Sequence, residues 1–235
     1  TVVKAALHHQ EIPWKNVIIS GWVLDPDRKK MSKSKGNVVV PTDLIEQYGA
    51  DAVRYWSANA RLGADTANDE QVFKVGKKLV VKIFNASKFV LNNYHEINEV
   101  ENKNIKNSLD KSIVYIFNNY LIKITNCLDK FQFAEALNLI EDFFWNYFTD
   151  NYIELVKNRR QSGNPSDSIS ASTTLILVLE NLLKLFAPFV PMITEEIWTT
   201  MHPEKKSIHI QDWPEKINIE FGNISSSQFE LARQA

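Results

Sequence analysis

Two lysines and two serines occur within five residues, Lys30-Met31-Ser32-Lys33-Ser34, and Gly36 and Asn37 follow directly. Serine hydroxyls donate hydrogen bonds, and the residues that follow give a short loop conformational freedom. Lysines are flexible point charges that can follow negative charge as it grows on phosphoryl oxygens and departing pyrophosphate. The segment therefore predicts a triphosphate-binding loop. The alternative is a solvated basic turn, although this pentapeptide arises by chance in only on the order of one chain in ten thousand of this length.

A continuous apolar, β-branched run over residues 16–24 precedes the loop and has the length of a strand. Asp25-Pro26-Asp27 then turns the chain. An unbroken apolar run is typical of a strand covered on both faces, so we expect one strand of a parallel sheet whose other strands are missing from this chain. The chain is expected to begin within an α/β domain.

The rest of the sequence predicts helices. Thr42 is expected to cap a helix that ends at Gly49, and Asp51 to cap a second one that runs to about Ala60. Period-3.6 apolar patterns and proline breaks predict further helices over 70–94, 109–129, 133–157 and 172–186, and a last helix through 198 with Thr194 near its start. A Ser-rich loop is expected over 162–172, and a short strand or an extended tail over 207–214.

Composition limits the class of protein. The 235 residues are 44% hydrophobic and 11% aromatic with only 7 Gly and 8 Pro, which favours one and a half to two mostly helical domains. A net charge of -1 gives no global nucleic-acid signal. The single cysteine, Cys127, excludes an internal disulfide and a paired-cysteine zinc site, and it is expected to be a packed thiol; no metal site is predicted. The longest apolar run, near Leu175, is interrupted by Glu180, so we expect a soluble protein.

The loop and its surroundings resemble a known signature. The run 30–39, followed by 43–45 and 48–54, resembles that of the class I aminoacyl-tRNA synthetases. The flanks 22–27 and 60–70 are similar to those of valyl-tRNA synthetases, in the variety found in archaea, and the motifs at 185–191 and 195–198 extend the similarity over nearly the whole chain. Leucyl- and isoleucyl-tRNA synthetases share the loop but not these flanks, and they remain the alternative.

The resemblance implies both a reaction and residue roles. It makes Lys33 the lysine that contacts ATP, with Lys30 assisting, so that these two are the catalytic residues of the loop; Met31, Ser32 and Ser34 complete the ATP-binding set. The implied enzyme uses ATP with Mg²⁺ to form valyl-adenylate and then charges tRNA(Val). It is expected to be cytoplasmic and monomeric, without a membrane segment.

The family's other ATP signature, His-x-Gly-His, is absent, since His8-His9 has neither its spacing nor its glycine. The editing domain is absent too, so this fragment is predicted to be inactive alone and to bind no cofactor.

The resemblance also implies a mainly α fold with two parts. Residues 1–76 are expected to be the end of a nucleotide-binding α/β domain with a connecting, stem-contact fold, and 77–235 an all-helical anticodon-binding bundle. A rival function is a stand-alone helical RNA-binding module that retains the loop only as a basic patch.

Charge segregation supports a tRNA-binding role for the helices. No Asp or Glu occurs between Gln71 and Tyr94, while five lysines lie opposite the apolar face of the predicted helix. A phosphate-contacting face is expected, and a solvated face is the alternative. Aromatic residues at 143–152 are expected to be core, leaving Trp145 and Asn146 as weaker candidates. The candidate tRNA contacts are Lys74, Lys78, Lys82, Trp145 and Asn146. Lys157, Arg159 and Arg160 close a helix, where cations favour the dipole, and a tRNA role is their alternative.

Overall fold

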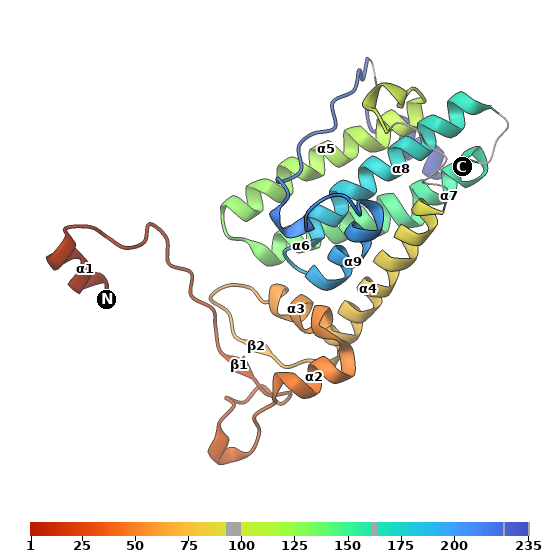
Figure 1. Ribbon diagram of the computed structural model, residues 1–235. Coiled ribbons are helices and arrows are strands. Elements are labelled where there is room, and N and C mark those ends of the chain that lie inside the picture. The colour runs from red at the N-terminus through yellow and green to blue at the C-terminus, as the bar shows by residue number, and fades with distance from the viewer. Residues whose placement is uncertain (93–99, 161–163, 223, 235) are drawn as a thin grey trace. The chain divides into compact units, whose positions relative to one another are not determined.

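The computed structural model describes residues 1–92, 100–160, 164–222 and 224–234, which form two compact units (Figure 1). The first, here called the loop unit, comprises residues 1–38 and 60–68. The second, here called the helical unit, comprises residues 39–59 and 69–235. Tyr94 and Ser162, which the sequence placed in a helix and a loop, lie outside the described residues.

The loop unit contains little regular structure. It holds helix α1 (Val2–His9), strand β1 (Val23–Leu24), a 3₁₀ turn (Lys33–Lys35) and strand β2 (Thr66–Ala67). Val23 pairs with Thr66 and Leu24 with Ala67 in parallel, as expected, but the expectation that the partner strand is missing from this chain was wrong, because β2 supplies it. The expected length was wrong, because only two of the nine residues over 16–24 have a strand partner to form a ladder with.

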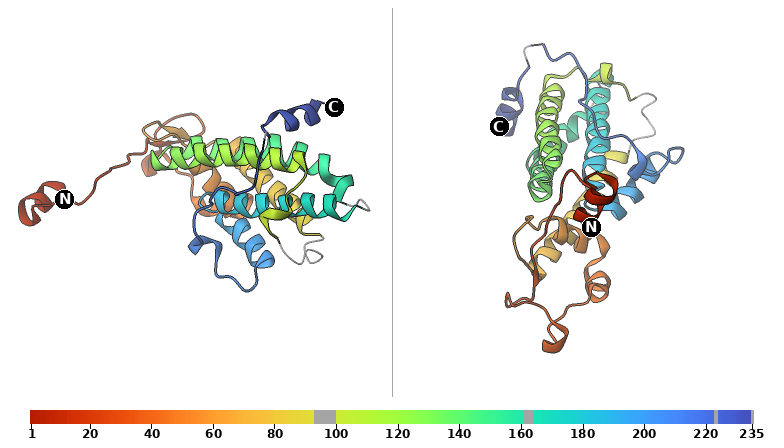
Figure 2. Two further views of the ribbon diagram at one scale, coloured as in Figure 1. Left: turned by 90° about the horizontal axis from the view of Figure 1, so that it is seen from above. Right: turned by 90° about the vertical axis from the view of Figure 1, so that its left-hand side faces the viewer.

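The helical unit contains α2 (Pro41–Tyr48), α3 (Ala50–Ala58), α4 (Glu70–Leu91), α5 (Ser108–Asp129), α6 (Phe133–Asp142), a π-helical segment (Phe143–Tyr152), α7 (Ile153–Arg160), α8 (Pro165–Phe186), α9 (Pro191–Met201) and α10 (Ser227–Gln234). Figure 2 shows α5, in green, and α8, in blue-green, side by side. α8 also contacts α4, α6, α7 and α9. The mainly α fold is therefore confirmed.

One large apolar core fills the helical unit. α8 contributes residues along most of its length, among them Leu175 and Leu179, and α4 and α5 contribute Leu79 and Phe117. α8 is long and apolar enough to cross a membrane by length and composition, contrary to the expectation that no apolar run approaches a span. The most apolar stretch of α8 is 72% buried, so α8 has the burial of a core helix.

Helix starts differ from the sequence prediction at three places. α2 begins at Pro41, whose fixed φ suits the first helical position, and Thr42 does not cap it. Asp51 lies in the first turn of α3, and its carboxylate instead accepts the backbone N–H groups of Met192 (3.0 Å) and Ile193 (2.8 Å). Asp51 therefore caps α9, which has no side-chain cap of its own.

The third difference is α8, which begins at Pro165, so the expected Ser-rich loop to residue 172 was wrong in its described part. The Asn164 side chain caps this start by accepting the N–H of Ser166 at 3.1 Å. The expected single helix over 133–157 is likewise divided by the π-helical segment.

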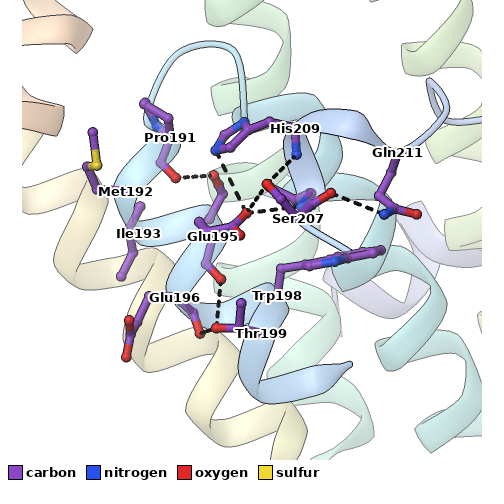
Figure 3. Close-up of polar contacts among 12 residues, drawn as sticks. Pro191, Met192, Ile193, Glu195, Glu196, Trp198, Thr199, Ser207, His209 and Gln211 are labelled. Atoms are coloured by element: carbon purple, nitrogen blue, oxygen red, sulfur yellow. Dashed lines mark hydrogen bonds and ion pairs between the residues drawn. The ribbon is translucent and has the colours of Figure 1, made fainter. Parts of the chain in front are cut away.

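The segment after α9 is neither a strand nor a free tail. A 3₁₀ turn forms at Ile208–Ile210, and the Glu195 carboxylate of α9 accepts the Ser207 hydroxyl (2.9 Å) and the Ile208 N–H (3.0 Å). Figure 3 shows the contact between Glu195 and Ser207, with Trp198 nearby. Trp198 is buried and its indole N–H donates to the carbonyl of Lys206 at 3.0 Å. The motif at 195–198 is thus a structural anchor.

Candidate functional site

The predicted phosphate loop of the loop unit is organised around one buried carboxylate. Asp25 is only 6% exposed, and its Oδ1 accepts the backbone N–H of Lys29 at 2.7 Å. Its Oδ2 accepts the side-chain amide of Asn37 at 2.8 Å. The Lys29 N–H, followed by the Asn37 amide, holds the pKa of Asp25 below its ordinary value because both donors favour the charged form. Asp25 is therefore a fixed anion at the base of the loop.

Asn37 connects this anion to the loop backbone. Its Oδ1 accepts the N–H of Ser32 at 2.9 Å, and its Nδ2 lies 3.3 Å from the carbonyl oxygen of Lys30. One amide side chain therefore holds the backbone on both sides of Met31. The chain then enters the 3₁₀ turn Lys33–Lys35, which ends at Gly36 with a φ of 67°.

The two candidate catalytic lysines have different surroundings. The Nζ of Lys30 lies 4.0 Å from the ring centroid of Trp22, a cation–π contact. Lys33 is exposed, and no carboxylate of the described residues lies within ion-pair distance of it. Between them, the hydroxyls of Ser32 and Ser34 lie 3.2 Å apart. The structure thus brings the five predicted residues into one exposed loop with one lysine held on an indole and the other free to meet a phosphate.

Strand pairing fixes the start of this loop. The N–H of Trp22 donates to the Asp65 carboxylate at 2.7 Å, and the N–H of Thr66 donates to the carbonyl of Trp22 at 2.9 Å. Gly21 permits this close approach, because a Cβ there would lie 2.1 Å from the carbonyl oxygen of Ala64. The backbone that presents Lys30 is therefore bound to the segment before α4.

Sequence reasoning missed three residues that shape the loop. The sequence assigned Trp22 to a strand and Asp25 to a turn, with no role in the loop. It gave Asn37 only as a source of flexibility, whereas the structure shows Asn37 as a restraint. The sequence features that could have indicated Asp25 and Asn37 are an aspartate at the end of a strand and an asparagine directly after the loop. The pairing itself joins residues twelve positions apart.

The lysine face of α4 is only partly uncompensated. Lys74 pairs with Glu70 at 2.9 Å, and Lys82 with Asp150 of the π-helical segment at 3.1 Å. Lys77 donates to the carbonyl of Gln47 at 3.3 Å. Lys78 and Lys88 are exposed and pair with no acid of the described residues. Acids on the first turn and on a neighbouring element therefore compensate Lys74 and Lys82, although no Asp or Glu occurs between Gln71 and Tyr94.

The aromatic series of the π-helical segment is core, as predicted. Phe143, Phe144, Phe148 and Tyr152 are each at most 1% exposed. Trp145 is half-buried against them, with the Nζ of Lys82 5.3 Å from its ring centroid. One more candidate, Asn146, is exposed, and its amide donates to Asp142 at 2.7 Å.

The two arginines at the end of α7 are structural. The Arg159 guanidinium donates to the buried carboxylate of Asp110, with an Nη1–Oδ2 distance of 2.9 Å. Arg160 is 8% exposed and donates to the carbonyls of Phe89 and Val90 at 2.9 and 2.7 Å. Their alternative role as tRNA contacts is therefore not supported. Cys127 packs against the core, as expected. Among the described residues, no three metal-ligating side chains form a cluster.

Comparison with known proteins places these features in a family. Residues 110–235, more than half of the chain, match the model of the anticodon-binding domain of tRNA ligase. The chain belongs to this family of tRNA ligases. Residues 1–69, which include the phosphate loop, match the model of the class I tRNA synthetases for I, L, M and V.

Several curated valine–tRNA ligases resemble this chain. The protein of Rickettsia canadensis is 46% identical over 222 residues, which cover 90% of this chain and 27% of the relative. The protein of Ehrlichia ruminantium is 45% identical over 217 residues, which cover 91% of this chain and 27% of the relative. The protein of Wolbachia pipientis is 46% identical over 227 residues, which cover 96% of this chain and 26% of the relative. The chain thus spans about a quarter of the length of these relatives. Since they are bacterial, the archaeal variety stays a prediction.

A solved ligase structure shares the fold. The LeuRS–tRNA–LeuAMS ternary complex of Agrobacterium radiobacter matches with a TM-score of 0.73 over 92% of this chain and 26% of that one. Their sequences are 22% identical, so this likeness concerns the fold alone.

Proposed function

We propose that this chain supplies the phosphate loop and the tRNA-binding helical body of a longer valine–tRNA ligase. The observation that carries the proposal is the loop itself: its backbone is fixed by Asn37, while Lys33 is exposed and pairs with no acid of the described residues. The identities of 44–46% with valine–tRNA ligases support valine over leucine or isoleucine.

The proposed reaction begins with attack of the valine carboxylate on the α-phosphorus of ATP, and pyrophosphate leaves. Negative charge grows on the phosphoryl oxygens, and Lys33 and Lys30 stabilise it, with Met31, Ser32 and Ser34 lining the same loop. Mg²⁺ enters with ATP and neutralises part of the phosphate charge. The valyl group then passes to tRNA(Val).

The rest of the active site belongs to the part of the ligase outside this chain. Apolar side chains of the loop unit, such as Ile19 and Trp22, are 73% and 62% exposed, which supports a covering partner. We assign residues 1–76 to the end of the catalytic domain and its stem-contact fold, and 77–235 to the anticodon-binding domain. The chain alone is proposed to be inactive, and the whole ligase to be a cytoplasmic monomer.

Amino-acid-dependent exchange of pyrophosphate into ATP tests the substrate. The full ligase that contains this chain is assayed with valine, leucine and isoleucine separately. Exchange with valine at a kcat/KM at least about tenfold above the other two, the discrimination expected of one methylene, supports the proposal. Preferred exchange with leucine or isoleucine would overturn it.

The lysine face of α4 is the proposed tRNA backbone contact. Lys74, Lys78 and Lys82 are its members, and the structure adds Lys88. Trp145, which lies against Lys82, and the next residue, Asn146, are the proposed base contacts. Lys78 and Lys88 are the stronger pair, because their charge is not matched by an acid of the described residues.

Salt titration of tRNA binding separates these lysines. Replacing Lys78 and Lys88 by alanine should reduce the slope of log K against log salt by about two units, roughly one per phosphate contact. The matched control, Lys74 and Lys82 replaced together, removes the same charge from the same helix but should reduce the slope less. Unchanged slopes in both double variants would remove α4 from the tRNA interface.

A further inference from the structure

We infer that Asp25 and Asn37 form a positioning pair that sets the backbone of the phosphate loop for adenylate formation. This inference rests on the proposed function, because it assigns a role within the same loop. Neither side chain needs to touch ATP. They act through Lys30, Ser32 and the turn that carries Lys33.

The burial of Asp25 is unusual for its surroundings. Within the described part of the loop unit, Asp25 and Asn68 are the buried side chains, at 6% and 8% exposure, and both are polar. A buried carboxylate is costly unless donors satisfy it, and here the N–H of Lys29 and the amide of Asn37 do so, one on each oxygen. A polar anchor held in this way fixes direction as well as distance.

The position of Asn37 determines what the anchor restrains. Its amide nitrogen bonds to Asp25 and approaches the Lys30 carbonyl, while its amide oxygen receives the Ser32 N–H. The pair therefore holds the loop backbone one residue before Lys33. Catalytic groups displaced by about 1 Å can lose on the order of 10²-fold in rate, so this restraint is placed where it affects the reaction.

The chemistry at position 37 requires both a donor and an acceptor. An aspartate there would keep the acceptor for Ser32 but would face the Asp25 carboxylate with like charge and without a donor. Exchanging the two residues restores complementarity: an asparagine at 25 can accept from Lys29 and donate to an aspartate at 37. Only the long contact with the Lys30 carbonyl, 3.3 Å, is lost.

The test measures valine-dependent pyrophosphate exchange by the full ligase in five forms: unchanged, Asn37→Asp, Asp25→Asn/Asn37→Asp, Lys33→Ala and Asp27→Asn. Asn37→Asp is expected to lower kcat on the order of 10²-fold, with a smaller change in the KM for ATP. The exchanged double variant should recover at least about tenfold of that loss, because the pair is rebuilt. Asp27 is the matched control, because it is an exposed acid two residues from Asp25 whose ion pair is with the exposed Lys29, 3.6 Å away. The Asp27→Asn variant should keep the unchanged rate.

Each outcome is decisive for one of the two proposals. If Lys33→Ala loses exchange while Asn37→Asp keeps it, the positioning pair is wrong and the proposed function stands. If the exchanged variant stays as low as Asn37→Asp, the loss does not come from their pairing and the inference is overturned. If Lys33→Ala itself keeps the rate, the proposed function fails.

Discussion

The loop unit and the helical unit are stabilised by different forces. In the described loop unit the buried side chains, Asp25 and Asn68, are polar, and directional hydrogen bonds set the backbone. In the helical unit a continuous apolar core joins α4 to α9, and side chains such as Leu79 and Phe117 are fully buried. Apolar burial gives stability without much direction, whereas hydrogen bonds give direction with modest net stability. The difference suits a loop that must place charges and a body that must hold its shape.

The helical unit also has buried polar anchors of its own. Asp110 is fully buried and accepts the hydroxyls of Tyr152 (2.7 Å) and Ser170 (2.6 Å) besides the Arg159 guanidinium. These contacts join α5, the π-helical segment, α7 and α8. Substitutions of these anchors test how much hydrogen bonds contribute to the stability of the helical unit beside its apolar core.

The largest expected effect is that of Asp110→Ala. The substitution leaves the partly buried Arg159 guanidinium without its carboxylate, which should lower the free energy of unfolding by about 3–5 kcal/mol. Urea unfolding of the chain, followed by helical circular dichroism, measures it. Asp129→Ala, an exposed acid on the same helix, should change stability by less than about 0.5 kcal/mol. A loss below about 1 kcal/mol for Asp110→Ala would show that the apolar core alone determines stability.

A smaller effect is expected for Asp51→Ala, which removes the cap of α9. Two N–H groups at the start of that helix lose their acceptor, so the free energy of unfolding should fall by about 1–2 kcal/mol. The control is Asp43→Ala, in the exposed first turn of α2. Its free energy of unfolding should lie within about 0.5 kcal/mol of that of the unchanged chain. Equal effects of the two substitutions would contradict a capping role for Asp51.

The smallest effect concerns Glu141, which accepts the hydroxyl of Tyr55 at 3.0 Å. Burial raises the pKa of Glu141 above its unfolded value. Its contribution to stability is therefore fully present below the unfolded pKa, near 4.3, and is lost as the pH rises through the folded pKa. Glu141→Gln should abolish this loss and leave the chain more stable at pH 7, by up to about 1 kcal/mol.

Thermal unfolding between pH 4 and pH 7 checks this prediction. Glu135→Gln, which removes an exposed acid of the same helix, should leave the pH dependence unchanged. A Glu141→Gln variant that is less stable than the unchanged chain at pH 7 would show that the charge is favourable where it lies.

Local patterns explain what the sequence predicted and what it did not. The start of α4 and both ends of α5 were predicted to within one residue, because their apolar residues repeat with the helical period. The phosphate loop was found because its residue types are contiguous. The start of α8 was missed because serines favour loops locally, and only the Asn164 cap and tertiary burial make them helical.

Contacts between distant residues were beyond such patterns. Asn37 bonds to Asp25, and Lys82 pairs with Asp150, 68 positions away. The second contact changed the predicted tRNA face, and the first supplied the restraint on the candidate site. Neither follows from residue type or spacing, since a folded backbone must first bring the partners together.

The central claim is that Lys33 stabilises the departing phosphates while the helical unit binds tRNA independently. Valine-dependent pyrophosphate exchange and tRNA affinity, both measured on the full ligase with Lys33→Ala, test it most directly. We predict a loss of about 10²–10³-fold in exchange, the effect typical of one group that stabilises a developing anion, with tRNA affinity unchanged. Near-normal exchange in that variant would contradict the account.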